Sequence, residues 1–265
     1  MIKVQNLNKT FGEIKAVVDV TFEVQSGEIF AFLGPNGAGK TTTIQMLTTL
    51  LKPTSGTVAI DGLDPVEKPL EVRRRFGIVF QDPSLDQELT AYENMDLHGV
   101  LYHVPRKVRA ERIEVLLKLF ELWDRRASLV KTFSGGMRRR LEIARGLLHT
   151  PKILFLDEPT LGLDPQSRNQ LWTHVKHLNE TEGVTVFLTT HYMDEADRVA
   201  HRVAIIDHGK IVAQGTCAEL KAQTGADTLE AAFLKLTGTT IRDETANSAD
   251  AMRQMARMWS RGQRR

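Results

Sequence analysis

The sequence of 265 residues predicts an α/β fold with an antiparallel β subdomain and an inserted α-helical subdomain. The main observation is a set of short, nearly continuous apolar runs, which are typical of parallel strands covered on both faces by helices. These runs lie at residues 29–33, 77–80, 153–156, 184–188 and 203–206. Helical stretches separate several of the runs, as parallel strands require, and are expected at about 40–51, 137–149, 166–181 and 192–199.

Two further regions complete the predicted architecture. Residues 20–24 and 57–61 alternate apolar with polar or small side chains, which suits half-buried antiparallel strands. From about residue 86 to 131 the patterns are helical with no strand between them, and apolar residues recur at helical spacing at Ile113, Leu116, Leu117 and Phe120. With the helix that follows, this interval predicts a helical subdomain at about 86–150, inserted between two strands of the core.

The main domain is expected to span residues 1–220, followed by a C-terminal extension at 221–265. Four apolar residues of the extension share one helical face: Leu229, Ala232, Phe233 and Leu236. The last fifteen residues contain five arginines and no acid, so the net charge of +2 becomes −3 without them. In this basic tail, apolar side chains could line a membrane-surface helix at Met252, Met255, Met258 and Trp259. Packing on its own domain, packing on a second copy, and disorder are the alternatives.

The composition limits the compartment and the kinds of partner. A single cysteine, Cys217, excludes an internal disulfide and fits a reducing compartment. The first residues lack the apolar stretch of a secretion signal, and no apolar run approaches the roughly 20 residues needed to cross a bilayer. We therefore expect a cytoplasmic protein whose membrane role, if any, comes through a partner or a surface contact.

A glycine-rich loop predicts a nucleotide site. It follows the apolar run at 29–33, precedes a helix and fits the pattern G-x-x-x-x-G-K-[ST]. Its residues are Gly34, Pro35, Asn36, Gly37, Ala38, Gly39, Lys40, Thr41 and Thr42. Backbone N–H groups of such a loop converge on phosphate oxygens at a helix N-terminus. Lys40 would reach the β- and γ-phosphates and Thr41 would bind Mg²⁺, whereas the alternative is a tight turn with a solvated lysine.

Two carboxylates, Asp157 and Glu158, stand at the end of the apolar run 153–156. Sites of open parallel sheets lie at the carboxyl ends of the strands. Asp157 fits the acid that supports Mg²⁺ beside a phosphate loop. In extended geometry Glu158 would point the other way, towards an attacking water as general base. The alternative is a surface turn with solvated acids.

Two more polar residues follow predicted strands at the same edge. His191 comes after the run at 184–188 and could hydrogen-bond the γ-phosphate or the water. Gln81 comes after the run at 77–80, with a side chain able to bridge metal and water. Either residue alone is unremarkable, and the interpretation depends on their position beside the other two motifs.

A second glycine pair opens the predicted helix at 137–149. Ser134 is a good N-cap residue, but Gly135 and Gly136 fall in the first turn, where glycine is unfavourable relative to alanine. Close approach of a phosphate would explain them. Since residues 34–42 already surround one face of a nucleotide, the pair predicts a half-site offered to a second copy. The arginines at 138, 139, 140 and 145 are expected on the polar, solvated face of the helix.

Taken together, these motifs resemble the ATP-binding cassette (ABC) family across residues 1–220. The phosphate loop, Gln81, the signature "FSGGM" at 133–137, the acids 157–158, "LGLD" ending at Asp164, and His191 occur once each and in order. The resemblance implies a P-loop (RecA-like) nucleotide-binding core that binds ATP and Mg²⁺, the metal being held by Thr41, Gln81 and Asp157. It also implies that Phe11 stacks on adenine and that Glu158 and His191 drive hydrolysis.

The resemblance further implies a head-to-tail dimer, with ATP between each phosphate loop and the opposite signature. Ser134, Gly135, Gly136 and Met137 would act in trans, and Asp164 would communicate across the interface. Several stretches look most like ATP-binding subunits of drug-resistance and nodulation-type exporters, whose permease is a separate chain gripped by the helical subdomain and the Gln81 loop. The protein would then be peripheral on the inner face of the cell membrane.

This sequence departs from the commonest family pattern at three positions. Phe133 replaces leucine and Met137 replaces glutamine in the signature, and Phe11 replaces tyrosine. The Ser134 and glycine backbone groups remain, so we expect a competent enzyme, with Met137 affecting the rate. The alternatives are a soluble ABC ATPase acting on nucleic acid or ribosomes, although no nucleic acid is expected as partner, and a catalytically silent regulatory cassette.

Overall fold

The computed structural model describes residues 1–238, and its core is a six-stranded sheet in the order β5-β6-β7-β3-β8-β9. The first five strands are parallel, and β9 pairs antiparallel with β8. The bounds are β3 Ile29–Leu33, β5 Phe76–Val79, β6 Ile153–Asp157, β7 Thr185–Thr190, β8 Arg202–Asp207 and β9 Lys210–Gly215. A second, antiparallel sheet has the order β2-β1-β4, with bounds β1 Ile2–Phe11, β2 Ile14–Val24 and β4 Ser55–Ile60.

The core sheet is apolar on both faces because each face is covered. In β3, Ile29, Ala31 and Leu33 belong to one cluster of buried residues, while Phe30 and Phe32 belong to the other. Since successive strand residues point to opposite faces, a strand covered on both faces is apolar at most of its positions. The predicted α/β fold with its antiparallel side sheet is confirmed.

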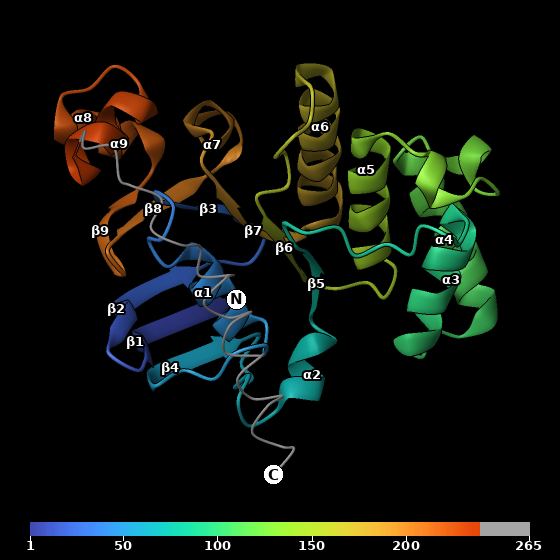
Figure 1. Ribbon diagram of the computed structural model, residues 1–265, viewed down its shortest axis with the longest axis horizontal. Helices are drawn as coiled ribbons and strands as arrows, with labels where there is room; N and C mark the ends of the chain where they lie inside the picture. The colour runs from blue at the N-terminus through green and yellow to red at the C-terminus, as the bar shows by residue number, and fades with distance from the viewer. Residues whose placement is uncertain (239–265) are drawn as a thin grey trace, which may run out of the picture.

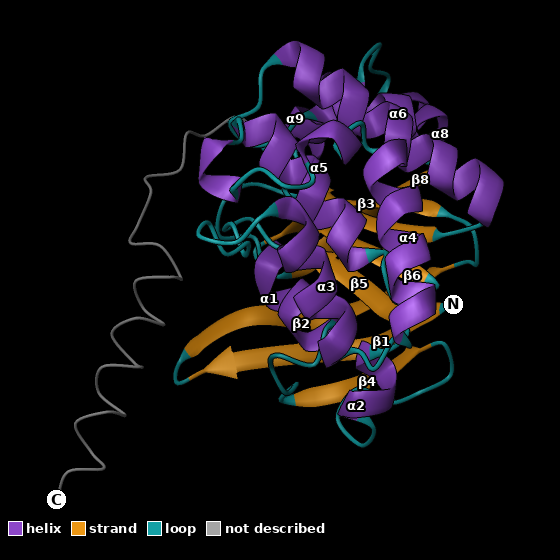
Figure 2. Ribbon diagram, turned by 90° about the vertical axis from the view of Figure 1, so that its right-hand side faces the viewer, coloured by secondary structure: helices purple, strands orange, loops and turns teal. Residues whose placement is uncertain are grey.

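Helices fill the space on both sides of the core sheet. Helix α1 (Lys40–Leu47) lies between the two sheets, where its buried residues join those of β1 and β3. On the opposite side lie α5 (Gly135–Gly146) and α6 (Pro165–Glu182), as Figures 1 and 2 show. The helices α7 (Met193–Val199), α8 (Cys217–Thr224) and α9 (Leu229–Thr237) contribute to the same cluster.

Between β5 and β6 the described elements are helical, as the sequence predicts. They are α3 (Ala91–Leu101), α4 (Arg106–Leu119), the short 3₁₀ turns η1 (Trp123–Arg125) and η2 (Val130–Thr132), and α5. Ile113, Leu116, Leu117 and Phe120 are all buried. A short helix α2 (Pro69–Arg73) precedes β5. In Figure 1 α3 and α4 stand at the end of the molecule farthest from α8 and α9.

Several predicted bounds differ from those observed. The strand predicted at 20–24 is the end of the longer β2, while β1 and β9 were not predicted. The helix predicted at 40–51 ends at Leu47, and Thr49 then adopts a left-handed φ of 67°. The helix predicted at 137–149 begins at Gly135, because the Ser134 hydroxyl caps it.

The described part of the C-terminal extension packs onto the core. The expected boundary after residue 220 falls within α8, which contacts β9 and α9. Leu229 and Ala232 of α9 are buried, and Phe233 and Leu236 pack against the same cluster, so the predicted apolar face is confirmed. The basic tail at 251–265 lies outside the described residues.

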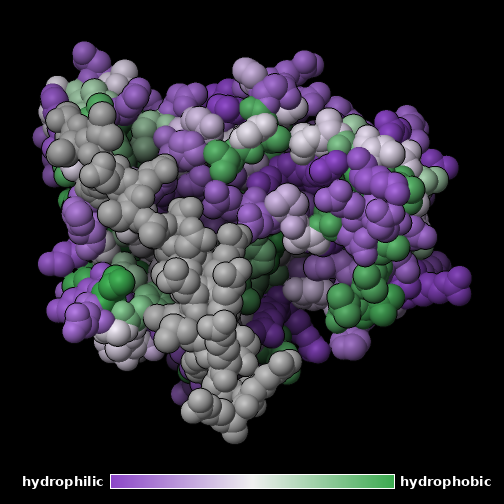
Figure 3. Space-filling view, viewed as in Figure 1, coloured by the Kyte–Doolittle hydropathy of each residue, from purple (hydrophilic) through white to green (hydrophobic). Residues whose placement is uncertain are grey.

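None of the helices within residues 1–238 is both long enough and apolar enough to cross a membrane. The face shown in Figure 3 is largely polar, and its apolar side chains occur in separate groups. One of these groups lies over the region of α3 in Figure 1.

Candidate nucleotide site

The carboxyl ends of β3, β6 and β7 bring the predicted site residues to one edge of the core sheet. The phosphate loop follows β3, the acids 157–158 end β6, and His191 follows β7. These strands are parallel neighbours, with β7 between the other two and Asp157 in register with Thr189. The parallel topology therefore assembles residues that are more than a hundred positions apart in the sequence.

The phosphate loop depends on glycine at defined positions. Gly37 and Gly39 have left-handed φ angles of 75° and 107°, which few other residues adopt. A Cβ on Gly34 would lie 2.4 Å from the Ile206 carbonyl oxygen, and one on Gly39 would lie 2.6 Å from that of Ala16. The loop is thus held tightly between β8 and β2 while Gly37 remains exposed at its tip.

Lys40 begins α1 and turns back over the loop. Its Nζ donates to the carbonyl oxygens of Gly34 at 2.7 Å and Pro35 at 3.2 Å, and lies 3.7 Å from Glu158 Oε1. Burial lowers the pKa of the ammonium, and the nearby carboxylates of Glu158 and Asp157 oppose this shift. A buried cation at the N-terminus of a helix is suited to bind a phosphate group.

Asp157 and Glu158 have different partners, although not for the predicted reason. Glu158 has a φ of 48°, so it is not extended and does not alternate with Asp157 as a strand residue would. The Asp157 carboxylate is buried and accepts a 2.6 Å hydrogen bond from the Thr189 hydroxyl. Burial raises the pKa of this carboxyl, and the Thr189 bond acts in the opposite direction. The predicted divergence is observed, but a left-handed turn after β6 produces it.

His191 lies directly beside Glu158. The His191 Nδ1 is 2.9 Å from Glu158 Oε2, so one carboxylate oxygen faces the imidazole and the other faces Lys40. The His191 side chain is 38% exposed, compared with 11% for Glu158. The structure therefore brings together three of the predicted side chains in an arrangement that is open to solvent on the histidine side.

Gln81 and Phe11 lie at the margins of this edge. Gln81 follows β5 with an exposed side chain, and its carbonyl oxygen accepts a 3.2 Å hydrogen bond from Arg139. Phe11 ends β1, and Lys9 Nζ lies 5.0 Å from the centre of its ring. The β1–β2 hairpin that carries Phe11 also provides Ala16, which contacts Gly39. Thr41 and Thr42 lie in the first turn of α1.

The signature residues contact α6 and the turn before it. The Ser134 hydroxyl accepts from Met137 N at 3.3 Å and so caps α5. A Cβ on Gly136 would lie 2.6 Å from Ser167 Oγ, so helix packing within the chain already requires this glycine. Gly135 is exposed, and a Cβ there would have only an ordinary contact with Leu163 at 3.7 Å. Packing within the chain therefore explains glycine at position 136 but not at position 135.

Asp164 lies beside the signature, as the N-cap of α6. Its carboxylate accepts from the backbone N–H of Ser167 at 3.0 Å and from the Ser167 hydroxyl at 2.6 Å. These bonds lower the pKa of the Asp164 carboxyl. Because Ser167 also contacts Gly136, the structure places Asp164 and the signature on one surface. Among residues 1–238, no hydrogen bond joins residues 133–137 to the phosphate loop.

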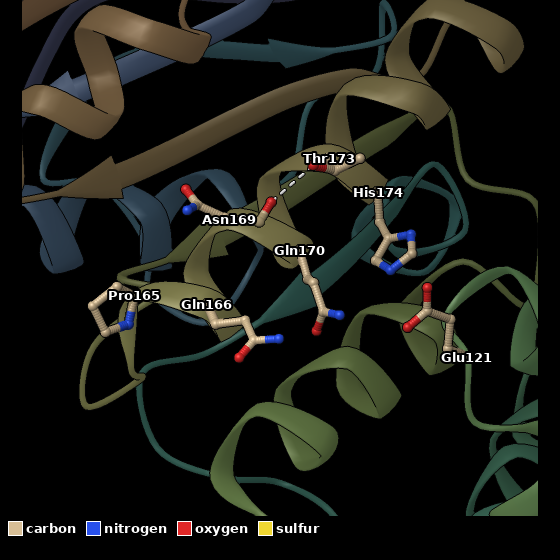
Figure 4. A pocket seen from close by; sticks show the side chains of 7 residues that line it. All are labelled: Glu121, Pro165, Gln166, Asn169, Gln170, Thr173 and His174. Carbon is tan, nitrogen blue, oxygen red and sulfur yellow. Dashed lines mark hydrogen bonds between the residues drawn. The ribbon is translucent and has the colours of Figure 1, made fainter.

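A pocket of about 480 Å³ lies elsewhere, along the outer side of α6. Figure 4 shows its lining: Glu121, Pro165, Gln166, Asn169, Gln170, Thr173 and His174. It contains none of the predicted site residues. The candidate nucleotide site is instead an open surface at the sheet edge, as expected if a second molecule supplies its other wall.

The prediction of solvated arginines on α5 is wrong for Arg139 and Arg145. Arg139 is only 7% exposed and donates to carbonyl oxygens of the segment that contains Gln81. Burial lowers the pKa of the Arg145 guanidinium, which donates to the Ser84 carbonyl oxygen. Sequence analysis also did not identify Thr189, which holds Asp157, or Arg168, which donates to the Leu163 carbonyl oxygen and lies over the Tyr192 ring. The spacing of Arg139 and Glu142 was visible, but the sequence did not show that both face the core.

A phosphate loop, a buried acid and a Glu–His pair at one sheet edge define a nucleotide-hydrolysing α/β protein. A model of the ABC transporter family matches residues 17–161. The chain is 47% identical over 228 residues, 86% of its length, to the daunorubicin/doxorubicin resistance ATP-binding protein DrrA of Streptomyces peucetius, of which it covers 69%. It is 40% identical to the Nod factor export ATP-binding protein I of Cupriavidus metallidurans, over 87% of this chain and 76% of that protein.

Solved structures agree with these relatives. An ATP binding subunit of an ABC transporter matches with a TM-score of 0.81 and 31% identity, over 89% of this chain and 99% of the other. A dimeric post-hydrolysis ATP-binding cassette bound to ADP and phosphate matches with a TM-score of 0.73 and 32% identity, over 82% of this chain and 98% of the other. The chain belongs to the ABC transporter family, and the predicted ATP-binding, ATP-hydrolysing subunit is confirmed. The relatives named here are resistance and export proteins, which argues against the nucleic-acid alternative.

Proposed function

We propose that this subunit hydrolyses Mg²⁺·ATP as a head-to-tail dimer and thereby energises export through a separate membrane permease. The observation that carries the catalytic part is the contact of Glu158 with both Lys40 and His191 at the sheet edge. Glu158 is the general base for the attacking water. His191 orients the Glu158 carboxylate through Nδ1, which leaves its other ring nitrogen to face the γ-phosphate or the water.

The phosphate-binding role of Lys40 requires a change of partner. Its Nζ currently donates to two carbonyl oxygens of its own loop. Phosphate oxygens are stronger acceptors for an ammonium than neutral carbonyl oxygens, because attraction between opposite charges adds to the hydrogen bond. ATP therefore replaces the loop carbonyls as partner of Lys40, and the loop N–H groups complete the phosphate site.

The residues proposed for Mg²⁺ fit that ion. Asp157 supplies a buried carboxylate whose pKa is raised by burial, and a neighbouring cation stabilises such a charge. Thr189 fixes this carboxylate through Oδ1. Thr41 in the first turn of α1 and the Gln81 side chain are the other protein ligands, consistent with the small number that Mg²⁺ takes beside phosphate oxygens. When bound, Mg²⁺ neutralises negative charge on the β- and γ-phosphates.

The proposal divides the site between two copies. Ser134, Gly135, Gly136 and Met137 complete the nucleotide site of the partner, and Asp164 lies on the same surface. The exposure of Gly135 at the N-terminus of α5 supports this role, since the N-terminus of a helix favours an anion. The half-site arrangement explains why the sheet-edge site of one chain is open.

The permease is proposed to dock on the helical subdomain near Gln81. On α3, Leu97, Val100 and Leu101 are 51%, 48% and 67% exposed. A group of exposed apolar side chains on one helix marks an interaction surface. Docking there would place this protein on the inner face of the cell membrane, with transport coupled to the closure of the dimer.

Co-expression with a candidate permease, a membrane protein encoded by a neighbouring reading frame or taken from a related exporter, tests the proposal. The wild type should copurify with that permease, hydrolyse ATP and increase the ATP-dependent accumulation of an exported compound in inverted membrane vesicles. The Leu101→Asp variant should retain ATP hydrolysis by the isolated chain but lose copurification, whereas Val115→Asp on α4, 62% exposed in the wild type, is the matched control. ATP hydrolysis that is stimulated by nucleic acid but not by the permease would contradict the proposal.

A further inference from the structure

The signature helix α5 contains a buried ion pair that the catalytic assignment does not use. Arg139 Nη1 lies 3.0 Å from Glu142 Oε2, and the two side chains are 8% and 3% exposed. Burying two charges is unfavourable unless the geometry is good and further hydrogen bonds satisfy the remaining donors and acceptors. The additional partners of this pair therefore indicate what it does.

All of these additional partners lie in residues 80–84, the segment that follows β5 and contains Gln81. Arg139 donates to the carbonyl oxygens of Phe80 at 2.6 Å and Gln81 at 3.2 Å. Glu142 Oε1 accepts from the backbone N–H of Ser84 at 2.7 Å. One helical turn further on, Arg145 donates to the Ser84 carbonyl oxygen at 2.8 Å. Three side chains of α5 thus hold one short backbone segment.

Close packing of the α5 backbone on β5 allows these side chains to contact residues 80–84. A Cβ on Gly77 of β5 would lie 2.3 Å from the carbonyl oxygen of Gly146, so the end of α5 rests directly on the strand. Residues one and two turns earlier on α5 then extend past the end of β5, where residues 80–84 begin. Figure 1 shows α5 above the carboxyl side of β5 and β6.

Arg138 and Arg140 of the same helix have different partners. Arg140 pairs with Glu121, whose side chain is 60% exposed, and Arg138 donates to the Lys131 carbonyl oxygen. Neither contacts residues 80–84. Stabilising the helix alone would not require the burial of Arg139 against the backbone of Gln81.

We propose that Arg139, oriented by Glu142, is a positioning residue for ATP hydrolysis that fixes the Gln81 backbone to the signature helix. This inference rests on the proposed role of Gln81 at the metal and the attacking water. The N-terminus of α5 serves the nucleotide of the partner, while Arg139 on the same helix holds a residue of its own site.

A double-mutant cycle between Arg139 and Gln81 tests this inference in the full-length chain. Steady-state kcat and KM for Mg²⁺·ATP are measured for the wild type, Arg139→Met, Gln81→Ala and the double variant. Arg139→Met should lower kcat about 10- to 100-fold, the usual effect of removing a group that orients a metal ligand, with little change in KM. Because residues that act as a unit are not additive, the double variant should be no slower than the slower single variant.

Arg112→Met is the matched control, since Arg112 also donates to two backbone carbonyl oxygens, those of Leu147 and Leu148, but at the far end of α5. Its effect should multiply with that of Gln81→Ala. If Arg139→Met does not fold, Arg139→Gln enters the same cycle. If the losses in kcat for Arg139→Met and Gln81→Ala multiply in the double variant while the wild type is active, this inference is overturned but the proposed function is not. A wild-type chain without ATP hydrolysis overturns the proposed function as well.

Discussion

The phosphate loop and the signature both contain glycines at the start of a helix, but these glycines are required for different reasons. In the phosphate loop, Gly37 and Gly39 have positive φ angles and Gly34 fits against the Ile206 backbone. In the signature, neither Gly135 nor Gly136 has a positive φ. Gly136 is buried against Ser167, and Gly135 is exposed. The phosphate loop needs glycine because of its backbone conformation. The signature needs Gly136 for packing against α6, whereas Gly135 is exposed to solvent.

Their surroundings differ in the same way. Lys40, Asp157, Glu158 and His191 gather around the phosphate loop within the chain. The signature turn contacts Leu163 and Ser167, which belong to the turn before α6 and its first residues. In the proposed composite site, one half therefore carries the reactive groups and the other half carries mainly a helix N-terminus.

The largest expected effect is that of Glu158→Gln on the reactive half. Removal of the general base should lower kcat on the order of 10²–10⁴-fold, while nucleotide affinity is kept because Lys40 and the loop remain. The variant should also accumulate as an ATP-bound dimer, detectable by size-exclusion chromatography with light scattering. Near-normal turnover would show that Glu158 is not the base.

The next largest effect is that of Gly135→Asp on the other half. A carboxylate at the helix N-terminus would repel the γ-phosphate of the partner's nucleotide, and we expect hydrolysis to fall at least about 100-fold, the effect of losing a preorganised donor. The fold should be unaffected, since the new side chain starts from an open position. ATP affinity of the isolated monomer, measured by calorimetry, should not change.

Mixing variants distinguishes a shared site from a site within one chain. Lys40→Ala damages the phosphate loop and leaves the signature intact, and Gly135→Asp does the reverse. Mixed dimers contain one composite site in which both halves are intact, so a mixture of two inactive variants should recover part of the hydrolysis. If the mixture is as inactive as its components, the signature does not act in trans.

A smaller effect is expected for Gly136→Ala, and it should be on stability. The new Cβ would lie 2.6 Å from Ser167 Oγ and 2.9 Å from Ser167 Cβ. Such overpacking typically costs about 1–3 kcal/mol, which thermal unfolding would detect as a lower Tm. In a Ser167→Gly background the same substitution should cost much less. An equal loss in both backgrounds would show that the contact with Ser167 is not the reason for glycine at position 136.

The smallest effect concerns acid stability at the far end of the signature helix. Burial lowers the pKa of His98 to about 3 and of His149 to about 4, from an ordinary value of 6.5. At pH values between about 4 and 6.5, histidines of the unfolded chain are protonated while the buried ones of the folded chain are not, so the unfolded chain binds more protons. The free energy of unfolding must therefore fall as the pH decreases from about 6.5 towards 4. The Tyr102 ring stacks on the His149 ring with 3.9 Å between the ring centroids, which keeps the imidazole buried.

His149→Gln tests this pH dependence, because an amide nitrogen can still donate to the Phe76 carbonyl oxygen that His149 Nε2 contacts. Urea unfolding at pH 7.5 and pH 5 should show a pH-dependent loss smaller than that of the wild type by an amount on the order of 1–2 kcal/mol. The exposed His177→Gln serves as control. The same loss in all three proteins would exclude His149 as a source of acid sensitivity.

The sequence was sufficient for what depends on local pattern. The loop at 34–42 is recognisable because its glycines, lysine and threonine follow an apolar run and precede a helix. The five buried strands are recognisable because a strand covered on both faces is apolar at most of its positions. The order of the motifs also identified the family, and the relatives confirm it.

Only the tertiary structure decided which side chains share an environment. Arg139 and Arg140 are adjacent in the sequence, but one is buried against the Gln81 backbone and the other pairs with an exposed acid. The left-handed turn at Glu158 and the need for Gly136 beside Ser167 likewise depend on neighbours that are remote in the chain. Periodicity specifies which face of an element is apolar, whereas burial of a charged residue depends on which backbone carbonyls the fold brings within its reach.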